Sequence, residues 1–241
     1  GKRFTTSQGT VLDNRLYWIS IAQLPSLAEA AKTQKRLEQA EQWSWMHAET
    51  IEAGAGRITF RDAGGRAVAS PNAPAVLVGA PVRLHSNRAM VLEGNLELNV
   101  GPEGKLEIVE SVPLESFLRG VLPSEMPSSW TIEALKAQAL SARSEVLAHM
   151  AGKHQLEGFD FCALEHCRVY RGSANGDAST DSAVDETAGE ILIQGNRVAA
   201  TVFSSNCGGW TENHDTVWSG PPDASLRGVS DAATSATSSS T

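Results

Sequence analysis

The sequence predicts an α+β fold in which antiparallel strands pack with a long central helix, preceded by a small strand–helix–hairpin module. Apolar residues recur every three or four positions between 132 and 150, which indicates an amphipathic helix of about five turns. An alternating run at 90–100, a turn at 101–104 and a return at 106–109 indicate an antiparallel pair. Of the 241 residues, 41% are apolar and 20% are charged, a balance typical of a globular protein.

Two helices are expected on either side of the segment Pro123–Pro127. The first starts at Pro113, and we expect Pro123 to end it, because the residue before a proline is pushed out of the α region. Thr131 is the expected N-cap of the second helix, and Glu133 suits its positive end. The apolar positions of the second helix are Ile132, Leu135, Ala139, Ala142, Val146 and Met150.

The N-terminal part is expected to form a module of its own. Residues 16–21 are rich in aromatic and β-branched side chains and predict a strand, and Ser26 can cap a helix over 27–42. Gly64-Gly65, between the runs 57–60 and 67–69, indicates a hairpin.

We therefore expect the small module to cover residues 1–80 and the main domain 81–231. Near the end of that domain, strands at 190–194 and 198–204 are expected to flank the turn Gly195-Asn196. The Ser/Thr/Ala-rich residues 232–241 are expected to be a disordered tail.

The net charge argues against nucleic acid as a partner, and the hydropathy argues against a membrane-spanning segment. Twenty Lys and Arg against 28 Asp and Glu leave a net charge of −8, the wrong sign for binding nucleic acid. No run approaches the ~18 uncharged apolar residues that span a membrane, so no membrane segment is expected in this chain. Gly1–Phe4 does not begin a signal peptide, because no apolar run follows it.

Glu125 is the first candidate for chemistry, because a proline stands two residues away on each side. The fixed φ angles of these prolines would hold its carboxylate in a defined place. If its neighbours Leu122, Met126 and Trp130 also surround it in space, desolvation would favour the protonated form, which suits a general acid. The alternative is a solvated loop glutamate, or one that caps the next helix.

The second candidate is a metal site. Zinc takes four nitrogen or sulfur ligands in a tetrahedron, and His154, Cys162, His166 and Cys167 could supply them. Because neighbouring residues rarely both reach one metal, Cys207 could replace either His166 or Cys167 as a ligand. Without a metal, the same cysteines would form a disulfide between Cys162 and Cys167 or stay as buried free thiols.

The third candidate is the segment 204–210, which follows a predicted strand and contains a glycine turn. With His214 or His166 as a base, Cys207 could be a hydrolase nucleophile. The glycines equally allow a ligand to approach the backbone, with Trp210 stacking on a sugar face. The alternative is a tight turn with a structural cysteine.

Six motifs from residue 112 onward occur in the order found in one family. They are LESFLRGVLPSEMP at 114–127, EALKAQALSAR at 133–143, CALEHCRVY at 162–170, AVDETAG at 183–189, SSNCGGWTEN at 204–213 and LRGVSD at 226–231. With these motifs the chain resembles the stage II sporulation protein D (SpoIID)/LytB amidase-enhancer family. Residues 17–42 are faintly similar to a SPOR repeat, a strand–helix module that binds stripped glycan.

The resemblance implies a lytic transglycosylase that cleaves peptidoglycan strands, preferably those stripped of stem peptides, with Glu125 as the acid and then the base. The acid would protonate the glycosidic oxygen that leaves N-acetylmuramic acid. The base would then take the proton of the C6 hydroxyl of the same sugar, which closes a 1,6-anhydro ring. Because the attack is intramolecular, neither a second carboxylate nor a placed water is needed.

The resemblance also implies a metal site, glycan-contacting residues and a place of action. Some family members carry zinc at the cysteine and histidine positions, which favours a structural zinc at His154, Cys162, His166 and Cys167. Polar and aromatic candidates for contact with the glycan are Lys136, Gln138, Arg143, Ser204, Ser205 and Trp210. The family acts outside the cytoplasmic membrane, so we expect an extracytoplasmic place of action, with any signal or anchor before Gly1.

Two different functions compete with the enzyme. The first is a cell-wall-binding enhancer of an N-acetylmuramoyl-L-alanine amidase, without its own activity, in which Glu125 is structural. Lys136, Gln138 and Arg143 would then be partner or scaffold residues, or the solvated face of their helix. The second is a peptidase that depends on Cys207, which has little support because no histidine is placed beside it.

Overall fold

The computed structural model describes residues 2–15, 24–40, 56–79, 81–84, 90–101, 104–150, 152, 154, 157–218 and 221–231. The chain divides into two compact units. The first unit contains residues 1–48, 144–150 and 192–241, and the second contains 49–143 and 151–191. Helices and antiparallel sheets both occur, which confirms the predicted α+β class.

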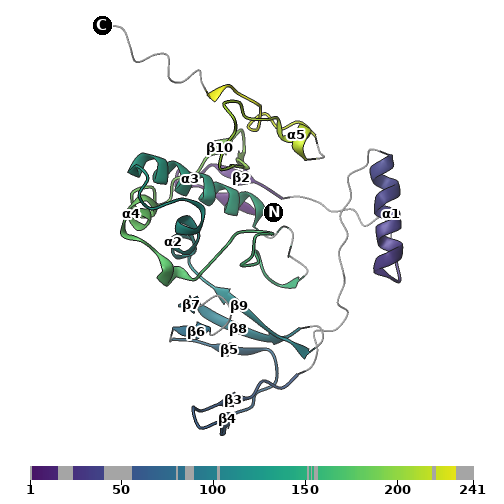
Figure 1. Cartoon of the computed structure of the whole chain (residues 1–241), viewed down its shortest axis with the longest axis vertical. Helices are drawn as coiled ribbons and strands as arrows, with labels where there is room; N and C mark the ends of the chain where they lie inside the picture. Colours follow the sequence, from purple (N-terminus) through teal and green to yellow (C-terminus); the bar gives the residue numbers. More distant parts are fainter. Residues whose placement is uncertain are drawn as a thin grey trace. The chain divides into compact units, whose positions relative to one another are not determined.

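The second unit contains a three-stranded antiparallel sheet in the order β5 (Ala75–Leu77), β8 (Asn95–Val100) and β9 (Leu106–Ser111) (Figure 1). The pair β8–β9 confirms the predicted antiparallel pair, with Val100 opposite Leu106 at the turn. The first part of the alternating run forms a separate strand, β7 (Met90–Leu92), which pairs with β6 (Val82–Leu84).

Gly94 separates β7 from β8. A Cβ on Gly94 would lie 2.3 Å from the carbonyl oxygen of Ser111, so only glycine lets the two backbones approach this closely. The backbone N–H of Gly94 donates to the carboxylate of Glu110 at 2.7 Å instead of continuing the ladder. The run therefore breaks into two strands at this residue.

One side of this sheet builds a hydrophobic core. Along β8, Leu96 and Leu98 are buried while their neighbours Asn95 and Glu97 are exposed, as the twofold alternation of a strand requires. The buried members of this core are Ile58, Ala75, Leu92, Leu96, Leu98, Val121 and Tyr170.

The predicted hairpin around Gly64-Gly65 is confirmed, with shorter strands than expected. It consists of β3 (Phe60–Arg61) and β4 (Ala67–Ala69), and Gly65 has a φ of +82° in the turn. The hairpin lies in the second unit, as does β5, which pairs with β8 beyond the boundary expected near residue 80. The domain ranges 1–80 and 81–231 stay a prediction.

Three helices share another core: α2 (Leu114–Glu125), α3 (Ile132–His149) and α4 (Ala178–Glu186) (Figure 1). The prediction of α3 is confirmed: of its apolar positions at helical spacing, Leu135, Ala139, Ala142 and Val146 are buried, and Ile132 is half-buried. The buried members of the shared core, all in the second unit, are Leu118, Leu122, Leu135, Ala139, Ala142, Ala183 and Val184.

The expectation that Pro123 ends the first of these helices is wrong. Helix α2 continues through Pro123 to Glu125, and the N–H of Met126 still donates to the carbonyl of Leu122 at 3.0 Å. A proline inside a helix costs about 3 kcal/mol. Leu118, Val121 and Leu122 are fully buried on this helix, and burying each such side chain gains about 1.5–3 kcal/mol, so packing outweighs the cost.

Helix α2 ends at the next proline instead. Met126 precedes Pro127 and has extended angles, φ −135° and ψ 141°. This is the conformation that a following proline imposes. Glu125 is therefore the last residue of a helix, and the loop begins after it.

The first unit contains two small hairpins. Strands β1 (Arg3–Thr5) and β2 (Val11–Asp13) form one of them. The turn predicted at 195–196 is confirmed between β10 (Ile193–Gln194) and β11 (Arg197–Val198), with strands of only two residues. The buried side chain of Asn14 joins the two hairpins through hydrogen bonds to the N–H and carbonyl of Val198, at 2.9 and 3.0 Å.

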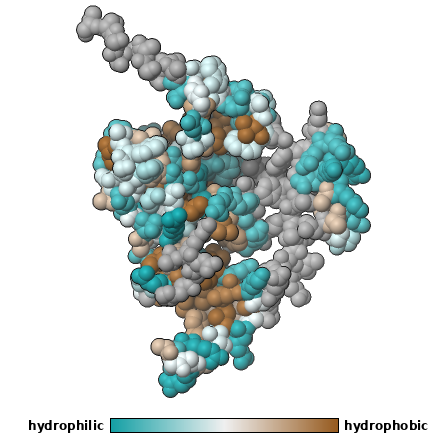
Figure 2. Space-filling model, in the orientation of Figure 1, coloured by the Kyte–Doolittle hydropathy of each residue, from teal (hydrophilic) through white to brown (hydrophobic). Residues whose placement is uncertain are grey.

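Helix α1 (Leu27–Gln39) confirms the helix predicted after Ser26, whose hydroxyl accepts the N–H of Glu29 at 3.3 Å. The visible face of α1 is mainly hydrophilic (Figure 2). A short helix, α5 (His214–Val217), lies near the end of the described chain. The strand predicted at 16–21 and the tail 232–241 lie outside the described residues. Among the described helices, none has the length and apolar character of a membrane span.

Candidate functional site

Glu125 is faced by a cation from a distant part of the sequence. Its Oε1 lies 3.9 Å from Nη1 of Arg168, and the two side chains are 21% and 11% exposed. The carboxylate can therefore still be reached from outside, while the guanidinium beside it is largely buried. Sequence reasoning missed Arg168; the available signal was its place next to Cys167 inside a family motif.

The expected apolar neighbours of Glu125 divide into two groups. Leu122 is fully buried in the core of the three helices, and Met126 packs against the same core. Trp130 is 52% exposed. Leu122 and Met126 thus face the helical core, Trp130 is largely exposed, and the apolar enclosure of the Glu125 carboxyl group stays a prediction.

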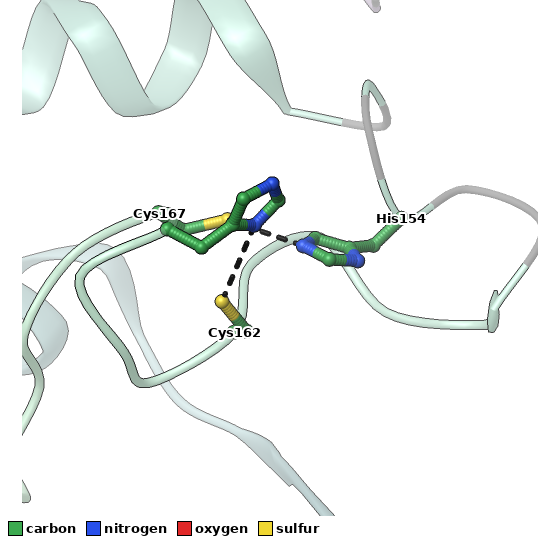
Figure 3. A group of neighbouring side chains, drawn as sticks. His154, Cys162 and Cys167 are labelled. Atoms are coloured by element: carbon green, nitrogen blue, oxygen red, sulfur yellow. Dashed lines mark hydrogen bonds between the residues drawn. The ribbon is translucent and has the colours of Figure 1, made fainter. Parts of the chain in front are cut away.

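The four metal-ligand candidates come together in the second unit. The ligand atoms of His154, Cys162, His166 and Cys167 all lie within 4.8 Å of one another. Figure 3 shows His154, Cys162 and Cys167 converging from separate loop segments. The ligand atoms of the neighbours His166 and Cys167 both lie within this group, and the expectation that only one of them binds a metal stays a prediction.

Three of the nitrogen–sulfur distances in this cluster lie near the value expected for a tetrahedral zinc site. The sulfur of Cys167 lies 3.2 Å from Nε2 of His154 and 3.5 Å from Nδ1 of His166, and the sulfur of Cys162 lies 3.7 Å from the same Nδ1. Zn–S and Zn–N bonds of about 2.3 and 2.0–2.1 Å at tetrahedral angles place nitrogen and sulfur ligands about 3.6 Å apart. The observed distances bracket that value.

Two further residues orient His154, which is 8% exposed. Glu157 lies 2.9 Å from Nδ1, and Phe159 stacks on the imidazole ring with centroids 4.6 Å apart. A carboxylate on one ring nitrogen fixes the tautomer and leaves the second nitrogen as a ligand, which is a usual feature of zinc sites. Sequence reasoning missed Glu157, although its spacing of three residues from His154 was a usable signal.

The disulfide considered for Cys162 and Cys167 does not form. These two cysteines and Cys207 all remain thiols. Cys207 belongs to the first unit, where its thiol lies 3.6 Å from the carboxylate of Asp231. The cluster in the second unit already contains four ligand atoms without Cys207.

Arg143 is built into the core of the second unit. Its side chain is 1% exposed, and it forms an ion pair with Glu115 of α2 at 2.7 Å. It also donates to the carbonyls of Val184 and Glu190, both at 3.2 Å, and to the hydroxyl of Thr187. Its guanidinium therefore joins α3 to α2 and to the end of α4.

The two remaining candidates on α3 differ from each other. Lys136 is bound to Glu186 at 2.7 Å and to Glu133 at 3.1 Å, and these two carboxylates raise its pKa, Glu186 most. Gln138 is 9% exposed, and its Nε2 has no hydrogen-bond partner among the described atoms. An unsatisfied buried amide is costly, which keeps Gln138 a candidate for a ligand or water contact.

Ser204, Ser205 and Trp210 belong to the first unit. Both serines are exposed, and Ser204 donates to the carbonyl of Asn206 at 3.4 Å. Trp210 is 61% exposed while its backbone bridges to Ser230. An exposed indole held by its backbone can stack on an apolar or sugar face.

Comparison with known proteins places these residues in one matched segment. Residues 102–193, which contain Glu125, Arg168 and the four metal-ligand candidates, match the family model SpoIID, described as stage II sporulation protein.

Curated relatives match over a similar part of the chain. The chain is 37% identical over 102 residues to the amidase enhancer of Bacillus subtilis. The aligned region covers 42% of this chain and 13% of the relative. It is 33% identical over 124 residues to stage II sporulation protein D of Bacillus subtilis, covering 46% and 36%. It is 37% identical over 111 residues to an uncharacterized protein of Brachyspira hyodysenteriae, covering 46% and 30%. The chain thus spans about a third or less of the length of these relatives.

Proposed function

We propose that this chain, whose residues 102–193 belong to the SpoIID/LytB family, is a lytic transglycosylase that cleaves peptidoglycan strands outside the cytoplasmic membrane. The observation that carries the proposal is the carboxylate of Glu125, partly exposed at the end of α2 and faced by Arg168, inside the segment that matches the family. We propose glycan stripped of its stem peptides as the substrate.

The proposed reaction needs one carboxyl group. As an acid, Glu125 donates its proton to the glycosidic oxygen leaving C1 of N-acetylmuramic acid, and the C–O bond breaks. The carboxylate then accepts the proton of the C6 hydroxyl, whose oxygen bonds to C1 of the same sugar. The products are a 1,6-anhydro end and a shortened strand, and no water is consumed. The guanidinium of Arg168 would balance the negative charge that Glu125 carries between the two transfers.

Zinc is the proposed metal of the four-ligand cluster. With His154, Cys162, His166 and Cys167 as ligands it would have no open position, which is the coordination of structural zinc sites. Bound there, zinc would join the loop segments that carry the four ligands and would stabilise their fold. The proton transfers are assigned to Glu125.

The decisive experiment is digestion of amidase-treated sacculi with the purified protein. Wild-type protein is expected to release products with 1,6-anhydro ends, identified by mass spectrometry, and Glu125→Gln is expected to release none. Glu190→Gln is the matched control, because Glu190 is an exposed glutamate of the same unit. Products with only reducing ends, or unchanged release by Glu125→Gln, would contradict the proposal.

The second candidate is an enhancer of a cell-wall amidase. Its support is the 37% identity to a relative named amidase enhancer. In this case the protein is expected to increase the rate at which an N-acetylmuramoyl-L-alanine amidase releases stem peptides from intact sacculi, and Glu125→Gln is expected to stimulate as well as wild type. Loss of stimulation in Glu125→Gln together with loss of glycan cleavage would instead assign the effect to the transglycosylase.

A further inference from the structure

We propose that Arg168 is the positioning residue for Glu125, and that the Cys/His loop, residues 157–171, sets the place of Arg168. The inference rests on the proposed function for the role of Glu125. It adds a second residue to the catalytic apparatus and a physical reason for a metal site near an acid that uses no metal.

The end of the Cys/His loop is fixed along the helix that carries Glu125. Phe117 of α2 stacks on Tyr170 with ring centroids 5.0 Å apart and on Phe161 at 6.3 Å. The backbone N–H of Arg171 donates to the carbonyl of Gly120 at 3.4 Å. The loop therefore contacts α2 on both sides of its cysteines.

Gly120 allows this contact. A Cβ there would lie 2.4 Å from the ring of Tyr170 and 2.8 Å from the carbonyl oxygen of Gly172. The Tyr170 hydroxyl donates to Glu110 at 2.9 Å, and burial, with the nearby Glu110 carboxylate, raises its pKa, so it remains a donor. Tyr170 is thus held between the sheet and α2, and it fixes the residues just before it.

Between these anchors, Arg168 reaches the end of the same helix. It directly follows Cys167, a metal-ligand candidate, so fixing Cys167 also fixes the backbone from which Arg168 extends. The Arg168 side chain is 11% exposed, and burial limits the number of rotamers that it can adopt. A metal at the cluster would therefore hold Arg168 in place without contacting the carboxyl group.

The contact with Glu125 suits a positioning role. Nη1 of Arg168 lies 3.9 Å from Oε1, at the end of α2 where the chain turns away at Met126. A cation on the side of Oε1 orients the carboxyl group, and we assign proton transfer to Oε2. A displacement of about 1 Å in a catalytic group can cost about 100-fold in rate, so orientation alone has a measurable effect.

The first test compares kcat and KM for anhydro-product release. We expect Arg168→Met to lower kcat by about 10- to 100-fold with KM within about threefold of wild type. Arg168→Lys keeps the charge but not the planar fork, so it is expected to recover part of kcat. Arg66→Met, which removes an arginine of the same unit whose side chain is 84% exposed, is the matched control and is expected to behave as wild type.

The second test needs no turnover. The side-chain carboxyl ¹³C resonance of Glu125, assigned by its absence in Glu125→Gln, is followed in zinc-loaded protein and after chelation. Chelation is expected to shift this resonance in wild type and to leave it in place in Arg168→Met. Arg168→Gln takes the place of Arg168→Met if that variant does not fold, with the same expected result.

The two tests separate the inference from the proposed function. Absence of anhydro products from wild type would overturn the function, while the ¹³C shift on chelation would still support the link through Arg168. The inference is overturned if kcat of Arg168→Met stays within about threefold of wild type while wild type is active. It is also overturned if chelation shifts the Glu125 resonance equally in wild type and Arg168→Met, or does not shift it in wild type.

Discussion

Replacing Arg143 by methionine is expected to destabilise the second unit by about 3–5 kcal/mol, the usual cost of breaking a buried ion pair. Methionine keeps the unbranched apolar stem of arginine but not its guanidinium, so the substitution removes the charge and the donors and leaves the space of that group unfilled. The variant thus tests whether Arg143 holds the helices together, in contrast to the role in glycan contact expected from the sequence.

The magnitude follows from the partners of Arg143. The guanidinium donates to both carboxylate oxygens of Glu115, at 2.7 and 3.0 Å, and charged hydrogen bonds contribute about 1.5–3 kcal/mol each. The Glu115 side chain is 32% exposed, so water would replace part of this loss. The carbonyls of Val184 and Glu190 would lose their donor, at about 1–3 kcal/mol for each that stays buried.

Urea unfolding followed by circular dichroism measures the loss. With an m-value of about 1–3 kcal/mol/M, a loss of about 3–5 kcal/mol is expected to lower the midpoint by about 1–5 M while m is unchanged. The double variant Arg143→Met/Glu115→Leu is expected to be more stable than Arg143→Met alone, because it leaves no unpaired carboxylate. Arg171→Met, which replaces an exposed arginine, is the control and is expected to leave the midpoint almost unchanged.

A loss below about 1 kcal/mol for Arg143→Met would refute the reasoning, since it would mean that water or another cation replaces the guanidinium. A double variant less stable than the single variant would refute the ion-pair account in particular. Loss of glycan binding with unchanged stability would return Arg143 to the substrate site.

Three further predictions concern a close packing contact, a partly buried carboxyl group and the metal-ligand cluster. Gly120→Ala is expected to displace Tyr170 and lower both Tm and kcat, because the new Cβ would lie 2.4 Å from that ring; an unchanged Tm in a thermal melt would contradict this. Asp181→Asn is expected to raise Tm at pH 7 and not at pH 3. Burial raises the pKa of Asp181, so the folded state loses stability as pH rises above the usual value of 3.8, and the variant removes that loss; a Tm rise at pH 3 as large as at pH 7 would argue against it. Purified protein is expected to hold about one zinc per chain by elemental analysis, and Cys162→Ser to lose the metal and several degrees of Tm; much less zinc in wild type would remove the site.

Local patterns in the sequence were sufficient for much of the fold. The period of α3, the hairpin at Gly64-Gly65 and the turn at Gly195-Asn196 follow from side-chain spacing and from positive φ angles that glycine adopts without strain. The four metal-ligand candidates were also found, because ligand type and close spacing are visible in the chain. Glu125 was singled out for its prolines, although the structure makes it a helix end.

Only the tertiary structure decided which of two competing local preferences won. At Pro123, burial of Leu122 and its neighbours outweighs the helix-breaking tendency, and the turn moves to Pro127. Contacts between distant segments are not visible in local patterns: the motif could single out Arg168, but only the structure shows that Arg168 faces Glu125 and that Arg143 is buried on Glu115. A sequence pattern shows which side chains share a face, but the partner of a charged side chain depends on which segments packing brings together. The sequence by itself thus determined the elements and the candidate acid, and the packing of the Cys/His loop along α2 decided what stands beside that acid.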